Sequence, residues 1–114
     1  MTDTPIVDAN KVKETKEKMI NDTELYSISD FFKIFGDSTR LKILWALDNN
    51  PLCVGDLCNV LDITKSAASH QLNILKANKI VTYKKQGKNV IYMLDDEHVS
   101  LIIETARKHL QEDK

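Results

Sequence analysis

The chain has 114 residues, and its 16 Lys and Arg against 17 Asp and Glu give a formal net charge of −1. This length suffices for one compact domain and is too short for two domains of ordinary size. No apolar run approaches the roughly 20 residues of a membrane span, and the polar N-terminus lacks a signal-peptide core. We therefore expect a cytoplasmic protein without membrane contact, in which Cys53 and Cys58 remain thiols.

Charge is distributed unevenly along the chain. Residues 1–62 carry 11 acids and 7 bases, residues 63–94 carry six lysines and no acid, and residues 95–114 carry 6 acids and 3 bases. A local positive excess of this size is typical of a surface that binds a polyanion. The alternative is an ordinary solvated lysine face.

The first half of the chain predicts a loose polar arm over residues 1–10, followed by helices. A short amphipathic helix is expected over 11–20 and a second over 25–35, ending at Gly36. A third helix is capped by Asp37 or Ser38 and ends before Pro51. Residues 11–114 are predicted to form one domain, with dimerisation helices near both of its ends.

The second half predicts two short helices separated by a turn near Asp62, the second of them beginning at Thr64 and burying Ala68, Leu72 and Leu75. Strands are then expected over 80–83 and 90–93, joined by a basic tip over 84–89. A last helix runs from about 96 to about 111. The predicted fold class is mainly α with a β-hairpin wing (α+β), a winged helix-turn-helix that forms a homodimer.

Such a helix pair places the start of its second helix in the major groove of DNA. The predicted partner is therefore double-stranded operator DNA, since the helix and the wing offer hydrogen-bond donors and cations to bases and phosphates. The candidate DNA-binding residues are Thr64, Lys65, Ser66, Ser69, His70, Gln71, Lys84, Lys85 and Lys88.

Two histidine and carboxylate pairs mark the last helix: Asp96 with His98, and His109 with Glu112. Eleven helical residues rise about 16.5 Å and return to nearly the same face, so one helix cannot bring both pairs to one ion. An antiparallel copy of the helix can, and a two-fold axis then creates two equivalent sites. Two imidazoles and two carboxylates suit Zn²⁺, with Co²⁺ also acceptable. The alternative is a pair of solvated histidines on a helix that only dimerises.

The cysteines are less informative. On a helix Cys53 and Cys58 would lie 140° apart, and Cys53 with Asp56 would supply only half of a second metal site. An alternative function is a winged-helix repressor that senses soft metals or oxidants through Cys53 and Cys58. Inert thiols are the alternative. Enzyme activity is not predicted, because no glycine-rich phosphate loop is present and Ser69 and His70 would point about 100° apart. A zinc-storage protein would leave the acid-free lysine segment unexplained.

Over roughly residues 25–112 the chain resembles the ArsR/SmtB family of bacterial metal-sensing repressors. The resemblance rests on FGDSTRLKIL at 35–44, LCVGDL at 52–57, SAASHQL at 66–72 and KQGK at 85–88. The pairs on the last helix are similar to the zinc site of the branch that binds metal between paired C-terminal helices. The resemblance implies a homodimer that represses metal efflux or sequestration genes and leaves DNA when metal binds. Gly55 stands where thiol-sensing relatives carry a cysteine, which favours zinc over cadmium, lead or arsenite.

Overall fold

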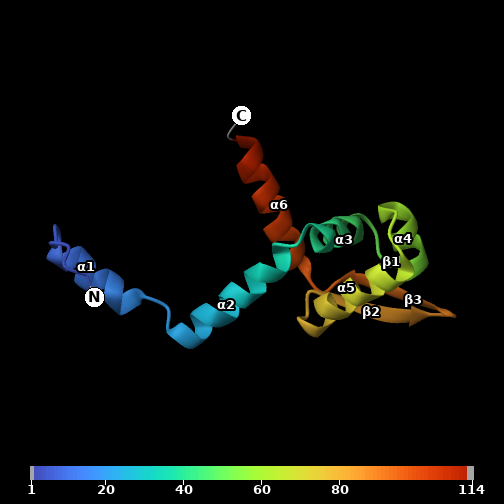
Figure 1. Cartoon of the computed structure of the whole chain (residues 1–114), viewed down its shortest axis with the longest axis horizontal. Helices are drawn as coiled ribbons and strands as arrows, with labels where there is room; N and C mark the ends of the chain where they lie inside the picture. Colours follow the sequence, from blue (N-terminus) through green and yellow to red (C-terminus); the bar gives the residue numbers. More distant parts are fainter. Residues whose placement is uncertain (1, 113–114) are drawn as a thin grey trace. The chain divides into compact units, whose positions relative to one another are not determined.

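The computed structural model describes residues 2–112, so positions 1, 113 and 114 of the predicted domain ranges lie outside the described residues. The elements, in chain order (Figure 1), are α1 (Ala9–Lys18), α2 (Asp22–Phe35), α3 (Ser38–Asn49), β1 (Leu52–Cys53), α4 (Val54–Leu61), α5 (Lys65–Ala77), β2 (Val81–Gln86), β3 (Asn89–Leu94) and α6 (Glu97–Glu112).

Contacts divide the chain into two compact units, which meet between Asp30 and Phe31 inside α2. In the first unit α1 begins at Ala9, two residues before the predicted start, because the Asp8 side chain caps it by accepting from the backbone N–H of Lys11 at 3.0 Å. No residue of α1 is buried. The flexibility expected for residues 1–10 stays a prediction.

The second unit contains the hydrophobic core, to which α3, α4, α5, the hairpin and α6 all contribute. Its fully buried larger side chains are Ile43, Leu44, Leu57, Leu72, Leu75, Ile80, Val81 and Ile103. Helix α5 buries Ala68, Leu72 and Leu75, as predicted from their helical spacing. The opposite face of α5 is thereby left to solvent.

The turn between α4 and α5 follows from local chemistry. Asp62 takes a left-handed conformation (φ 53°) that ends α4, a conformation that aspartate tolerates better than most residues. The Thr64 hydroxyl then caps α5 by accepting from the backbone N–H of Ala67 at 3.1 Å. A predicted turn and a predicted cap are confirmed, and they make α4 and α5 a helix-turn-helix.

The sheet differs from the prediction in two respects. The strand β1, too short to show a period of two, was not predicted; it pairs with β3 and gives the antiparallel order β1-β3-β2. The predicted tip over 84–89 was too long, because Gln86 already pairs with Asn89. Only Gly87 and Lys88 form the loop, and the positive φ of Gly87 (64°) is one that glycine adopts freely.

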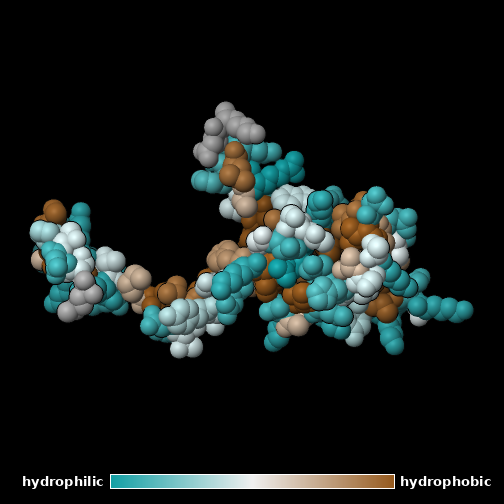
Figure 2. All heavy atoms as spheres, viewed as in Figure 1, coloured by the Kyte–Doolittle hydropathy of each residue, from teal (hydrophilic) through white to brown (hydrophobic). Residues whose placement is uncertain are grey.

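Helix α6 is buried only over its first half. Val99 and Ile103 lie in the core, whereas the apolar stripe predicted for this helix continues to Leu110, which is 66% exposed. Figure 2 shows hydrophobic side chains on the visible face of α6. Nowhere in residues 2–112 does a helix combine the length and the apolar character that crossing a membrane requires.

Candidate functional site

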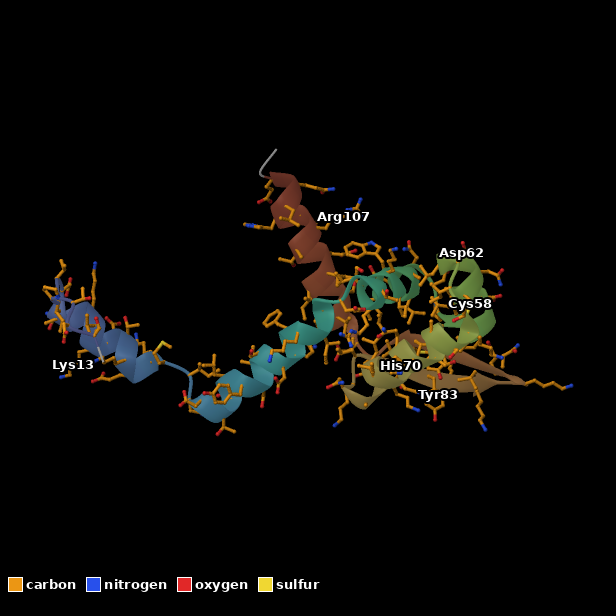
Figure 3. The ribbon with its side chains drawn as sticks, viewed as in Figure 1. Lys13, Cys58, Asp62, His70, Tyr83 and Arg107 are labelled. Atoms are coloured by element: carbon orange, nitrogen blue, oxygen red, sulfur yellow. The ribbon has the colours of Figure 1, made fainter. Side chains whose placement is uncertain are left out.

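The outward face of α5 presents the sequence-predicted DNA-binding residues unequally. Lys65, Ser66 and His70 are exposed, and Figure 3 shows His70 on this helix. Ser69 is half-buried, and the Thr64 hydroxyl is occupied by the helix cap. Gln71 is the exception, since its Oε1 is buried and accepts no hydrogen bond from any residue that the structure describes. The start of α5 therefore offers a cation, hydroxyls and an imidazole to solvent.

The hairpin adds three more cations beside this face. Lys84 and Lys85 are exposed residues of β2 rather than of the loop, and Lys88 occupies the loop itself. Strand pairing fixes Lys84 opposite Ile91 and Lys85 opposite Val90, so the two lysines project to opposite faces of the hairpin. Each face of the hairpin therefore carries one of these two lysines.

An aromatic contact holds the hairpin against α5. The Lys76 ammonium lies 4.6 Å from the ring centre of Tyr83, a cation–π contact between the end of α5 and β2. The Tyr83 and Tyr92 rings are 5.7 Å apart across the two strands. The Lys76 contact therefore links α5 to the wing, and Figure 3 labels Tyr83 on the hairpin.

A cavity of about 430 Å³ lies where the start of α4, the start of α5 and the wing meet. Two lysines line it, one from each side of the predicted DNA-binding surface: Lys65 from α5 and Lys88 from the wing loop. The other lining residues are Cys53, Val54, Gly55, Asn89, Val90 and Tyr92. Sequence reasoning missed this cavity because it depends on β1 reaching β3.

Asp96 and His98 lie next to each other at the start of α6. Asp96 Oδ1 accepts from the backbone N–H of His98 at 2.8 Å and lies 3.2 Å from His98 Nδ1. The His98 side chain is 78% exposed, so solvent reaches both donor atoms.

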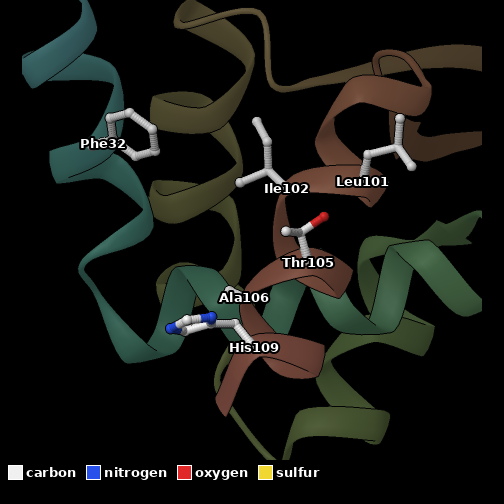
Figure 4. Close-up of a pocket in the computed structure, with 6 residues that line it drawn as sticks. All are labelled: Phe32, Leu101, Ile102, Thr105, Ala106 and His109. Carbon is white, nitrogen blue, oxygen red and sulfur yellow. The ribbon is translucent and has the colours of Figure 1, made fainter. Parts of the chain in front are cut away.

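His109 lies eleven residues further along α6, near its C-terminal end. It lines an apolar groove of about 620 Å³ together with Phe32, Leu101, Ile102, Thr105 and Ala106 (Figure 4). Glu112 is the exposed last residue of the helix. Among residues 2–112 the structure brings no three metal-ligating side chains together within one chain. The two pairs thus remain separate, as the helical rise between them requires.

The cysteines do not share a helix. Cys53 closes β1 and stands at the N-cap of α4 with an extended backbone (φ −76°, ψ 165°), so the predicted angle between the two thiols was wrong. Both thiols are free and half-buried. Asp56 is exposed in the first turn of α4. Neither thiol meets a metal-binding cluster in the described part of the chain.

Comparison with known proteins agrees with this architecture. A family model described as bacterial regulatory protein, arsR family, matches residues 37–83, from the cap of α3 into β2. The transcriptional repressor SmtB homolog of Synechocystis sp. is 34% identical over 112 residues, which cover 98% of this chain and 85% of that protein. The chain belongs to the ArsR family of bacterial regulatory proteins.

Two further similarities support this membership. The cadmium resistance transcriptional regulatory protein CadC homolog of Staphylococcus aureus is 35% identical over 113 residues, covering 98% of this chain and 93% of that one. The crystal structure of AntR, named as an antimony-specific transcriptional repressor, superimposes with a TM-score of 0.74 at 29% identity, over 84% of this chain and 87% of AntR. The chain therefore shares the fold of this repressor.

Proposed function

We propose that this ArsR-family chain is a homodimeric transcriptional repressor that binds operator DNA through α5 and the wing and is released when zinc binds at the dimer interface. The observation that carries the proposal is the separation of two surfaces on one chain. One is basic and exposed, while the other combines two half-sets of metal ligands with an uncovered apolar groove. The chain is proposed to act in the cytoplasm and to have no catalytic role.

The basic surface supports DNA binding. Between residues 63 and 94 the chain has no carboxylate, so no acid interrupts the exposed lysines of α5 and the hairpin. Lys65, Ser66 and His70 would reach base edges or phosphates at the start of the helix, as in other helix-turn-helix proteins. Lys84, Lys85 and Lys88 would neutralise phosphates on the flanking backbone.

The apolar surface supports a second copy of the chain as partner. A groove of about 420 Å³ is lined by side chains of α2, α3 and α6, namely Phe32, Phe35, Leu41, Trp45, Ile102, Ile103, Ala106, Arg107 and Leu110. Contiguous exposed apolar patches of this kind mark interaction sites in soluble proteins. A two-fold axis beside α6 would cover the groove and bring His109 of one protomer toward the partner's half-site.

The donor atoms fit zinc. Bonds of about 2.0 Å in a tetrahedral site place neighbouring ligand atoms about 3.3 Å apart. Asp96 Oδ1 and His98 Nδ1 are already 3.2 Å apart in the free chain. Asp96 and His98 of one protomer with His109 and Glu112 of the other would complete an N₂O₂ set, the type that zinc accepts in closed sites. Bound zinc would tie the two α6 helices in one arrangement.

The relatives differ in the metal that their names contain. One is named for cadmium resistance and another is called antimony-specific, both ions that favour sulfur ligands. This chain has Gly55 two residues after Cys53, so a pair of thiolates is missing at that position. Its imidazole and carboxylate pairs favour zinc, and the exposed position of His98 keeps the half-site accessible.

Release from DNA follows if zinc and DNA favour different arrangements of the dimer. By thermodynamic linkage zinc weakens DNA binding by the same factor by which DNA weakens zinc binding. A coupling of about 3 kcal/mol corresponds to a change of roughly 150-fold in affinity. The mechanism therefore needs only a change in the spacing of the two α5 helices.

A fluorescence-anisotropy titration onto the upstream DNA of the chain's own operon, at fixed salt, tests the proposal. Tight binding with chelator and release with stoichiometric zinc are expected, and the response should be lost in His98→Ala and in His109→Ala. DNA binding that does not change when zinc is added would reduce the proposal to a repressor without metal regulation. Absence of binding under both conditions would remove DNA as the partner at that promoter.

A further inference from the structure

The cavity between α4, α5 and the wing is named the notch. It brings together residues that are far apart in the sequence. Lys65 and Lys88 are 23 positions apart in the chain, yet the fold places both in its wall. Asn89 adds an amide side chain that can donate hydrogen bonds. None of the residues that line the notch is acidic.

Gly55 is one of the residues that line the notch. A Cβ added at this residue would meet no heavy atom within 4 Å, so the space in front of the α4 backbone is open. The first backbone N–H groups of a helix lack partners within the helix and attract anions. Lys65, Lys88 and Asn89 therefore border an open space beside the first turn of α4.

We infer that the notch binds one backbone phosphate of the bound DNA, held between Lys65 and Lys88. This inference rests on the proposed DNA-binding function and adds to it a specific anion site. Cys53 is one of the residues that line the notch, whereas Cys58 is not. An adduct on Cys53 would add bulk at the wall of the notch, and this gives the inferred phosphate site a chemical test.

Gly55→Glu tests the site with little risk to the fold. The new side chain enters open space, glutamate suits the first turn of a helix better than glycine does, and its carboxylate repels phosphate. DNA affinity should fall about tenfold or more, the effect expected when a charge-assisted contact is lost. Gly55→Gln is the matched control of nearly equal size, and its DNA affinity should fall much less. Equal affinities for the two variants at unchanged melting temperature would overturn the inference.

The salt dependence of binding counts the phosphates that are neutralised. Each phosphate contact contributes about 0.9 to the slope of log affinity against log salt. Because both lysines are inferred to face the same phosphate, the double variant Lys65→Gln with Lys88→Gln should reduce the slope by about one. A reduction of about two would mean separate phosphates and would refute the shared site.

Thiol protection supplies an independent readout. In a Cys58→Ser chain, alkylation of Cys53 by iodoacetamide transfers a carboxamidomethyl group to Sγ with loss of iodide, and bound operator DNA should slow it. In a Cys53→Ser chain the same DNA should leave alkylation of Cys58 unchanged. After alkylation at Cys53, DNA binding should be lost. Equal alkylation rates at Cys53 with and without DNA would contradict the inference, whereas failure of the unmodified chain to bind DNA at all would instead remove the proposed function.

Discussion

Mixing two variants that are each defective in zinc binding should restore zinc binding, if the metal site is shared between protomers. His98 and His109 both lie on α6, eleven residues and therefore about 16.5 Å of helical rise apart. Each proposed site takes His98 from one chain and His109 from the other. A His98→Ala homodimer and a His109→Ala homodimer therefore each lose one ligand in both sites.

The heterodimer of these two variants recovers one complete site, because one protomer still supplies His98 and its partner still supplies His109. Random exchange makes about half of the dimers heterodimers, which gives about one half of a tight site per dimer. The wild-type dimer has two equivalent sites, so the mixture should show about a quarter of the wild-type capacity.

The assay is a titration of zinc in competition with a chromophoric chelator, after the variants have exchanged subunits. A mixture of His98→Ala with Asp96→Ala is the matched control, because both substitutions affect the same half-site and no heterodimer regains a complete set. No recovery in the first mixture, or equal recovery in both, would refute the shared site. Full zinc capacity in either single variant would show that the ligands lie elsewhere.

Four further expectations follow. Leu72→Ala should lower the free energy of unfolding by about 2–5 kcal/mol, since this side chain of α5 is fully buried. Urea unfolding measures the loss. The control Val60→Ala, at a residue 61% exposed, should change the free energy of unfolding by less than about 0.5 kcal/mol. Thr64→Ala should lower the free energy of unfolding by about 1 kcal/mol, because the α5 cap is lost, whereas Thr64→Ser should keep most of that stability. A similar loss of stability in both variants would argue against the cap. Ala106→Glu places a charge in the apolar groove and should shift the chain toward monomer in analytical ultracentrifugation, while Lys108→Glu, at a residue outside the groove, should not. Zinc affinity should decrease on acidification, because protons compete with zinc for the imidazole nitrogens; an affinity that is flat from pH 8 to pH 5 would count against histidine ligands.

The apolar face of α6 shows what the periodicity of apolar residues can and cannot predict. Its spacing predicted one continuous stripe, and the stripe is present, but only Val99 and Ile103 are used inside the chain. Periodicity reports that a face is apolar and does not report which partner covers it. The exposed Leu110 and the groove beside it identify the uncovered part, and this could be seen only after the core had formed.

Local chemistry was sufficient for the helices around the helix-turn-helix. The caps at Asp37 and Thr64, the turn at Asp62 and the buried triplet Ala68, Leu72 and Leu75 depend on neighbours within a few residues, and all could be predicted from the sequence. The lysine-rich segment and the two histidine pairs were also evident without coordinates, because charge and spacing are properties of the chain itself.

Tertiary structure alone decided where distant residues meet. The two-residue strand β1 lacks a readable pattern and exists because β3 offers it hydrogen-bonding partners. Its pairing moves Cys53 off any helix and into a cavity with Lys65 and Lys88, which no spacing in the sequence relates. Gln71, a polar residue of α5 that the sequence predicted to bind DNA, has a buried amide oxygen. The sequence by itself therefore determined the helices, their caps and the charged surfaces, since these depend on short-range interactions, whereas packing between distant segments decided which side chains share a site.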